Sequence, residues 1–298
     1  MKEATIRWSW DHEQAAPFDL KMLYSEAGFG FAERLGLDDV AKLFNPGAFG
    51  LFAFLGDRLV GAARVLSDEL LVSWLAEICV HPSWRGRAIG RGFLERIDER
   101  FGKTALYCDA PAEHVDFFKK GGIRPRVKLN VCRRLPCEGT ILPQESSQAV
   151  ITDDAFKYSA AQFDQVVDSV GFGITEKGMS REKLYERLFG EGAFGAFAEN
   201  AEGQLIGFAR VFSDCFSKCY LTEICVHPDW QRRGVGRALV RRIVSRFSRT
   251  TIYTEAFPNA LPLLRTHGVL PATDLVGCSR APLTEQEAIS NAVGGRGP

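Results

Sequence analysis

The sequence lacks the features that would point to a membrane or to nucleic acid. No apolar run approaches the roughly 20 residues that a helix needs to cross a bilayer. The first residues alternate polar and apolar side chains and lack the apolar core of a signal peptide. Net charge is also absent, since 37 Lys and Arg balance 37 Asp and Glu, which removes the electrostatic argument for nucleic acid or an anionic membrane as a partner. We therefore expect a cytoplasmic protein.

A zinc-binding pattern is also missing, although the chain has eight cysteines. No two cysteines are separated by two residues, and Cys215 and Cys219 have no second Cys or His pair after them at a zinc-like spacing. We expect no metal site, and we expect reduced cysteines that fill cores and loops. The rest of the composition, 46% hydrophobic and 25% charged, is typical of a globular protein.

What the sequence does contain is an internal repeat. The segment GAARVLSD at 61–68 returns as GFARVFSD at 207–214. Over the 37 positions that begin at these two segments, aligned without gaps at an offset of 146, 19 residues are identical. The period is too long for a solenoid unit, so the repeat indicates a duplicated domain.

The repeat predicts two tandem domains with the same α/β fold. We place the N-terminal domain at 1–136, a polar linker at 137–148 and the C-terminal domain at 149–283. Each copy predicts an opening strand, a helical region, two strands joined by a turn and a third strand that stops at His-Pro. An amphipathic helix, another strand, a short helix and a closing strand follow. This order predicts, in each domain, a mixed and mainly antiparallel central sheet flanked by helices.

The most informative segment of the second copy joins the third strand to the long helix. Amides at a helix start have no partner within the helix, and the helix dipole adds partial positive charge, so this junction favours an anion. Glycines let a phosphate approach the backbone, and arginines add full charges. The residues at this junction are Gln231, Arg232, Arg233, Gly234, Val235, Gly236 and Arg237.

These residues resemble the GNAT superfamily of N-acetyltransferases. Gln231-x-x-Gly234-x-Gly236 matches the Q/R-x-x-G-x-G/A pyrophosphate loop of that family, and the preceding E-I-C-V-H-P matches its fourth strand. The resemblance covers both copies. It implies acetyl-CoA as the acetyl donor and coenzyme A as a product, with the pyrophosphate on the loop amides. It also implies that the backbone of Cys225 and Val226 pairs with the pantetheine arm, and that the acceptor amine enters from the other side of a split between the fourth and fifth strands.

The first copy departs from this pattern at one position, where Ala88 replaces the first motif glycine. We expect alanine to be compatible with a negative φ near a helix start, with its N–H still available. The sequence therefore does not decide whether the first copy also binds coenzyme. Its candidate coenzyme-binding residues are Val80, Arg85, Gly86, Arg87, Ala88, Gly90 and Arg91.

Two glutamates occupy equivalent places in the strand that leads to the loop. Glu77 and Glu223 lie among Leu, Ile, Cys and Val residues, so each is either close to the central split or tied into a structural hydrogen-bond network. Partial burial would raise the pKa of such a carboxyl toward the range of a general base. The resemblance implies the catalytic role, because family members often use an acid on this strand to deprotonate the amine.

Two further pairs of repeated residues have both a functional and a structural interpretation. Asp68 and Asp214 end the preceding strand and either contact a cationic substrate or cap a turn. His81 and His227 precede proline at the strand end and either relay a proton or mark the entry to the helix.

One residue that the resemblance implies is missing. Many family members carry a tyrosine on the short helix that protonates the departing thiolate, and the matching positions here are Phe118 and Leu264. Neither side chain can donate a proton. Tyr253, His267 or a water molecule are the possible substitutes.

Together these patterns predict an N-acetyltransferase that moves acetyl from acetyl-CoA to a primary amine of a small molecule, with the second copy as the catalytic centre. Two alternatives stay open: a non-catalytic acyl-CoA sensor or scaffold, and a specialised tandem acetyltransferase of thiol biosynthesis. We expect a monomer in which the two domains act as a pseudo-dimer, because a linker of about 12 residues keeps the copies at high effective concentration.

Overall fold

In a computed structural model, the chain is described at residues 5–137, 149–173 and 178–284. The predicted linker lies outside these ranges except for its first residue, Cys137. Within them, no helix is long and apolar enough to span a bilayer. The chain forms two compact units, which consist of residues 1–126 with 275–298 and of residues 127–274. We call them unit 1 and unit 2.

Unit 1 is built almost entirely from the first repeat. Its elements are β1 (Ile6–Ser9), α1 (Pro17–Glu26), the 3-10 helix η3 (Leu37–Phe44), β2 (Ala48–Leu55), β3 (Arg58–Ser67), β4 (Val72–Val80), the 3-10 helix η4 (Pro82–Trp84), α2 (Ile89–Phe101), β5 (Ala105–Pro111), α3 (Val115–Lys120), β6 (Arg124–Pro125) and β14 (Leu275–Arg280). Seven strands form one sheet in the order β1-β2-β3-β4-β5-β14-β6.

Unit 2 repeats this arrangement. Its elements are β7 (Asn130–Arg134), β8 (Val150–Thr152), α4 (Ala160–Ser169), α5 (Arg181–Leu188), β9 (Ala193–Glu199), β10 (Leu205–Ser213), β11 (Lys218–Val226), the 3-10 helix η7 (Pro228–Trp230), α6 (Val235–Arg246), β12 (Thr251–Ala256), α7 (Leu261–Arg265) and β13 (Leu270–Pro271). Its seven strands have the order β13-β7-β12-β11-β10-β9-β8.

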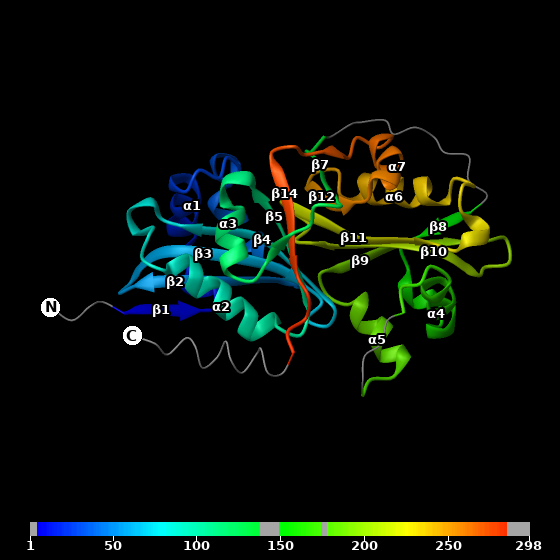
Figure 1. Cartoon of the computed structure of the whole chain (residues 1–298), viewed down its shortest axis with the longest axis horizontal. Coiled ribbons are helices and arrows are strands. Elements are labelled where there is room, and N and C mark those ends of the chain that lie inside the picture. Colours follow the sequence, from blue (N-terminus) through cyan, green and yellow to red (C-terminus); the bar gives the residue numbers. More distant parts are fainter. Residues whose placement is uncertain (1–4, 138–148, 174–177, 285–298) are drawn as a thin grey trace. The chain divides into compact units, whose positions relative to one another are not determined.

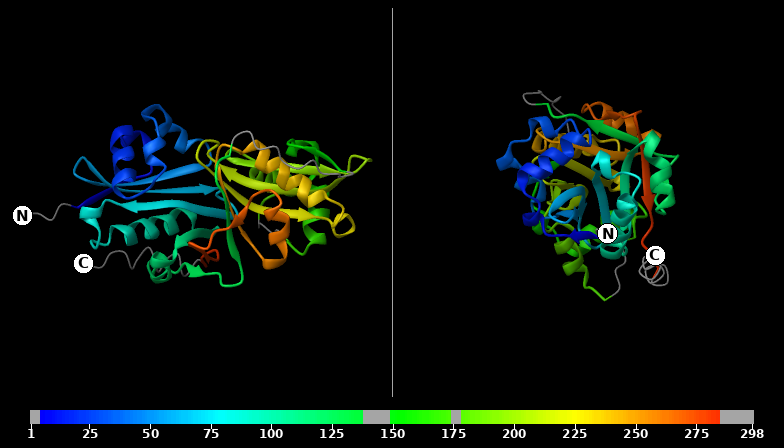
Figure 2. Two further views of the ribbon diagram at one scale, coloured as in Figure 1. Left: turned by 90° about the horizontal axis from the view of Figure 1, so that it is seen from above. Right: turned by 90° about the vertical axis from the view of Figure 1, so that its left-hand side faces the viewer.

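Each sheet is mainly antiparallel, as the sequence predicts. The pairs β4–β5 and β11–β12 are parallel, and the other strand pairs of the described residues are antiparallel. Helices cover both faces of each sheet: α1 lies opposite α2 in unit 1 (Figure 2), and α4 and α5 lie opposite α6 and α7 in unit 2 (Figure 1). The central strand β10 is buried along its whole length, because helices remove both of its faces from water.

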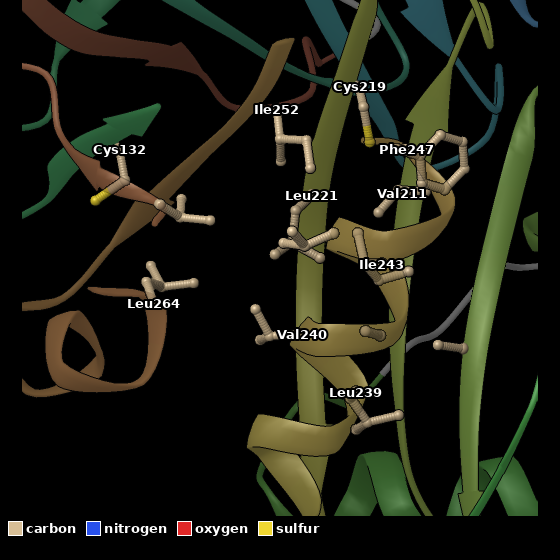
Figure 3. Close-up of a cluster of buried hydrophobic side chains, with 14 of the residues drawn as sticks. Cys132, Val211, Cys219, Leu221, Leu239, Val240, Ile243, Phe247, Ile252 and Leu264 are labelled. Atoms are coloured by element: carbon tan, nitrogen blue, oxygen red, sulfur yellow. The ribbon is translucent and has the colours of Figure 1, made fainter. Parts of the chain in front are cut away.

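The closing strand of each repeat lies in the sheet of the other unit. β7 belongs to the first repeat but pairs with β12 of the second, and β14 belongs to the second repeat but pairs with β5 of the first. Cys132 of β7 accordingly joins the buried cluster of unit 2 together with Ile252 and Leu264 (Figure 3). The predicted boundaries 1–136 and 149–283 describe the duplicated sequence, and the compact units differ from them by this exchange of strands.

Candidate active site

The two parallel strands of unit 2 separate toward their carboxyl ends. β11 pairs with β12 from Lys218 to Tyr220, opposite Thr251 to Tyr253, and the ladder ends there although β11 continues to Val226. In unit 1, the ladder between β4 and β5 likewise ends at Leu75. Each sheet therefore contains the split that the resemblance implies, at the end of the strands that leads to the glycine-containing loop.

The direction of the backbone amides beyond this split follows from the pairing of β11 with β10. The N–H of His227 donates to the carbonyl of Ile206 at 2.9 Å, so the backbone amide of His227 points toward β10. The direction of the backbone hydrogen-bonding groups alternates along a strand. The backbone amides of Val226 and Ile224 therefore point the other way, toward β12. The amide of Cys225, one of the two residues expected to pair with the pantetheine arm, therefore points toward β10, while that of Val226 and that of Ile224 point toward β12. Ile224 could have been recognised from strand alternation once the strand end was fixed.

The loop after β11 contains two left-handed backbone positions, and each repeat places glycine at a different one. In unit 2 these positions are Arg232 (φ 61°) and Gly234 (φ 84°). In unit 1 they are Gly86 (φ 78°) and Ala88 (φ 58°). The expectation of a negative φ at Ala88 is wrong, because the residue before α2 must adopt the left-handed turn that glycine adopts before α6.

The loop is held to the strand end by the first of its residues. Gln231 donates to the carbonyl of Val226 at 3.0 Å, and the equivalent Arg85 donates to the carbonyl of Val80 at 3.2 Å. In the second repeat the helix α6 begins at Val235, and its first-turn amides point out of the helix end. The positively charged side chains around this end are exposed; they are Arg232, Arg233 and Arg237.

The two histidines before the loop have a structural contact. Nδ1 of His81 accepts from the N–H of Ser83 at 3.1 Å, and Nδ1 of His227 accepts from that of Asp229 at 3.3 Å. Each histidine thus caps the short helix η4 or η7. This contact favours the helix-entry interpretation over proton relay.

The surroundings of the second motif glycine differ between the units. A Cβ on Gly236 would meet side-chain atoms of Leu263 at 3.6 Å, an ordinary contact distance. A Cβ on Gly90 would meet the ring of Phe117 at 3.1 Å. The loop of unit 2 therefore has more room beside its glycine.

Both candidate bases are paired with a buried arginine on the neighbouring strand. Arg64 donates to the two carboxylate oxygens of Glu77 at 2.7 and 2.6 Å, and Arg210 donates to those of Glu223 at 2.7 and 3.3 Å. The Glu77 side chain is inaccessible to solvent, whereas that of Glu223 is 19% exposed. The pairs confirm a buried hydrogen-bond network, and only the carboxylate of unit 2 is within reach of solvent.

The candidate substrate-binding aspartates lie in turns. One carboxylate oxygen of Asp214 accepts from the amides of Phe216, Ser217 and Lys218, and the side chain is fully buried. Asp68 accepts from three turn amides in the same way. The structure favours the turn-capping interpretation for both, because in each case a carboxylate oxygen accepts from three turn amides.

The positions that match the missing tyrosine lie inside the hydrophobic cores. Phe118 and Leu264 are 5% and 2% exposed. Of the possible substitutes, His267 is 1% exposed, and its Nδ1 lies 2.9 Å from the Thr266 hydroxyl. Tyr253 is partly exposed and occupies the last paired position before β11 and β12 separate. Of these two side chains, Tyr253 is the one that lies at the split.

A residue that the sequence analysis missed lies on the same strand. Glu255 follows Tyr253 by two positions and therefore shares its face of the sheet, the face of Arg210 and Glu223. Its carboxylate oxygens are out of reach of solvent. The available signal was the repeated pair LYCDA and IYTEA, which places Asp109 at the equivalent position in unit 1.

The thiol beside the split is not a candidate nucleophile. Burial raises the pKa of Cys225 to about 12 and likewise raises the pKa of Cys79 to about 12. A thiol needs to ionise before it attacks a carbonyl carbon. Both cysteines are therefore neutral at neutral pH, which favours direct transfer over a covalent acyl-cysteine.

Comparison with known families matches both repeats. The acetyltransferase (GNAT) family matches residues 8–119, and the acetyltransferase (GNAT) domain matches residues 192–268, so together they cover more than half of the chain. The chain belongs to the GNAT family of acetyltransferases. As a tandem GNAT protein it carries one family domain in each repeat, which confirms the predicted fold and the general activity.

Similar proteins include two acetyltransferases and a solved tandem GNAT protein. The chain is 26% identical over 243 residues to the mycothiol acetyltransferase of Rhodococcus jostii (strain RHA1), with 76% of each chain covered. It is 23% identical over 233 residues to GCN5-related N-acetyltransferase 3, chloroplastic, of Arabidopsis thaliana, with 74% of this chain and 90% of that one covered. A solved tandem GNAT protein from the clavulanic acid biosynthesis pathway shares the fold at a TM-score of 0.54 and 15% identity, with 94% of this chain and all of that one covered.

Proposed function

We propose that unit 2 transfers acetyl from acetyl-CoA to a primary amine of a small molecule. The observation that carries the proposal is the end of the β11–β12 ladder at Tyr220, beyond which no strand pairs with the β12-facing edge of β11 in the described residues, up to the loop at the start of α6. Acetyltransferases of this family use acetyl-CoA, and a strand edge that runs into a helix N-terminus suits a pantetheine arm followed by a pyrophosphate.

The proposed donor site consists of backbone groups with positive charge around them. The amides of Val235 and Gly236 would bind the pyrophosphate, and Ile224 and Val226 would pair with the pantetheine arm. Exposed arginines of the loop add electrostatic attraction. The loop of unit 1 has an equivalent strand edge, but Ala88 holds a left-handed conformation that alanine disfavours and Phe117 crowds Gly90.

The proposed reaction is a direct attack of the amine on the thioester. Glu223, directly or through a water molecule, removes a proton from the acceptor ammonium, and the neutral nitrogen attacks the carbonyl carbon. An amide of the unpaired β11 edge donates to the oxygen that becomes negatively charged. The nitrogen, positively charged after the attack, gives up its second proton to water as the carbon–sulfur bond breaks, and the thiolate takes a proton from Tyr253 or from water. Exposure supports Glu223 over Glu77 as the base of the protein.

Charge at the split supports an amine as the acceptor. Glu223 and Glu255 lie on the same face of the sheet, one on each of the two separating strands. Although Arg210 balances the charge of Glu223, the carboxylate can accept a proton from an ammonium group, which a neutral alcohol does not offer. Asp68 and Asp214 are not part of this proposal, since their carboxylates cap turns.

A second candidate is an acetyltransferase of thiol biosynthesis. It is supported by the similarity to the mycothiol acetyltransferase of Rhodococcus jostii, which extends over most of both chains. The acceptor would then be an amine within a thiol precursor, and the chemistry at Glu223 would be unchanged.

A panel of amines assayed for release of the coenzyme A thiol tests the proposal. We expect release that depends on both acetyl-CoA and one class of amine, with the acetylated amine detected by mass spectrometry. Including thiol-protected cysteine conjugates in the panel separates the two candidates. A protein that binds acetyl-CoA but releases no thiol above the amine-free background would be a sensor and would overturn the enzymatic proposal.

A further inference from the structure

The two exchanged strands occupy equivalent positions in the two sheets. β7 places Cys132 opposite Thr254, and β14 places Cys278 opposite Cys108. The offset of 146 that relates the repeats converts the first pair into the second. The two closing strands therefore pair in the same register. By this register alone, each strand could pair with either sheet.

Both strands are integral to the core of the unit that receives them. Cys132 and Cys278 are fully buried, and each belongs to the hydrophobic cluster of the receiving unit. Arg280 of β14 forms an ion pair with Asp98 at 2.9 Å and donates to the carbonyl of Thr104 at 3.3 Å. Removing β14 would leave Asp98 as an unpaired carboxylate that is 9% exposed, which is unfavourable in a core.

The connections explain why the chain exchanges its strands instead of folding them back. Pro125 of β6 pairs with Cys278, and Pro271 of β13 pairs with Cys132. If β14 folded back in its own repeat, Cys278 would lie opposite Pro271, and the turn would come from residues 272–277. Three of those residues, 275–277, pair with β5 in the exchanged arrangement. Exchange keeps them in an extended ladder.

The exchange reaches the proposed acetyl-transfer site. On β12, Tyr253 pairs with Arg133 and Glu255 pairs with Val131, and both partners belong to β7. Where β12 separates from β11, its other edge is therefore held by β7, a strand of the first repeat. This contact gives the first repeat a role in unit 2 that does not depend on its own coenzyme loop.

We propose that each repeat is the other's binding partner through these strands: the first repeat completes unit 2 by donating β7, and the second repeat completes unit 1 by returning β14. The two halves of the chain then remain associated without a covalent connection between residues 137 and 149. The proposal concerns assembly and holds whether or not unit 2 catalyses acetyl transfer.

The first test cuts the full-length protein after it has folded. A protease site placed within 138–148 allows cleavage under native conditions, followed by light scattering on a sizing column. We expect one species of about 33 kDa, the mass of the intact chain. Two separate species of about half that mass would overturn the proposal.

Native cysteines distinguish strand exchange from simple docking of two closed domains. Directly opposed residues of antiparallel strands have Cα atoms about 4.5–5.5 Å apart, within the range that a disulfide spans. Oxidation of the cut protein with a small diffusible oxidant should join Cys108 to Cys278 and give one band of about 33 kDa on a non-reducing denaturing gel. If the strands folded back, Cys108 would face Cys132 of its own fragment, and the fragments would stay separate.

Matched variants make this result specific. The exposed Cys137 and Cys215 are replaced by serine in every sample, because they could form unrelated disulfides. Cys278→Ala should abolish the joined band, and Thr254→Cys, which faces Cys132 across β7 and β12, should restore it in that background. A cut protein that gives no joined band with either the native pair or the Thr254→Cys pair would overturn strand exchange.

Discussion

Arg210 holds Glu223 less tightly than Arg64 holds Glu77. The second hydrogen bond of each bidentate pair measures 3.3 Å in unit 2 and 2.6 Å in unit 1. The looser carboxylate is also the one that solvent reaches. The equivalent ion pairs thus differ in solvent exposure, and this difference is the reason for proposing Glu223 and not Glu77 as the base.

The first prediction compares the two carboxylates. Glu223→Gln should lower kcat about 100- to 10,000-fold at neutral pH, the usual contribution of a positioned base. The loss should shrink at high pH, where more of the amine is already deprotonated, and acetyl-CoA affinity should change little. Steady-state kinetics from pH 6 to 9 measures this effect.

Glu77→Gln is the matched control for that experiment. It should leave kcat nearly unchanged but lower the free energy of unfolding more than Glu223→Gln does, since Arg64 and Glu77 are both fully buried. If Glu77→Gln abolished activity in a folded protein while Glu223→Gln kept it, unit 1 would be the catalytic unit.

The second prediction concerns the pyrophosphate site. Gly236→Asp places a carboxylate beside the loop amides, where it repels a phosphate, so acetyl-CoA affinity should fall by at least tenfold in calorimetry. Gly236→Ala is the control, because its Cβ meets its nearest neighbour at 3.6 Å and adds no charge. Equal affinity of the aspartate variant and the wild type would mean that this loop is only a turn.

The third prediction concerns the left-handed positions of the loops. Ala88→Gly should raise the free energy of unfolding by about 1 kcal/mol, and Gly234→Ala should lower it by about the same amount, because alanine disfavours a positive φ. Urea unfolding of the two variants provides the measurement. Changes of the same sign in both would contradict the left-handed geometry.

The fourth prediction concerns pH and the helices α4 and α5. Arg181 and Tyr185 hydrogen-bond to Asp164, and the guanidinium holds the pKa of that carboxyl below its ordinary value of 3.8. A lowered folded pKa stabilises the protein above pH 3.8, and this contribution is lost as pH falls through the folded value. Asp164→Asn should therefore destabilise the protein at pH 7 and reduce the further loss of stability between pH 5 and pH 2.

Chemical unfolding at several pH values checks the effect of Asp164. The control is Asp116→Asn, whose side chain is 85% exposed and lies 3.7 Å from Lys119. Exposed pairs of this kind contribute little, so its unfolding should follow the wild type at every pH. A pH dependence of Asp164→Asn identical to that of the wild type would contradict the role given to this ion pair.

The fifth prediction concerns the position of the missing tyrosine. Leu264→Tyr should lower the free energy of unfolding by about 1–3 kcal/mol and should not raise kcat, because the larger side chain enters a filled core. Leu263→Tyr is the control at the neighbouring, partly exposed position. An active and fully stable Leu264→Tyr variant would show that this part of the core can open toward the substrate.

The sequence determined the features that depend on local patterns. The duplication, the order of strands and helices, and the glycine-containing loop before α6 follow from repeated segments, hydrophobic periodicity and the residues at a helix start. These signals are short-range, so they are visible without knowing which segments meet in space. The family resemblance rests on the same residues, from Gln231 to Gly236.

Only the tertiary structure decided which strands complete each sheet and which carboxylate is accessible. β7 and β14 share one pattern and one register, so the sequence favours neither sheet, and the choice depends on how residues 126–129 and 272–274 connect them. The shared E-I-C-V-H-P of Glu77 and Glu223 cannot reveal that one side chain is inaccessible and the other partly exposed, because exposure depends on side chains that pack from other elements. The left-handed turn at Ala88 is likewise imposed by the path from β4 into α2, which overrides the preference of alanine for a negative φ.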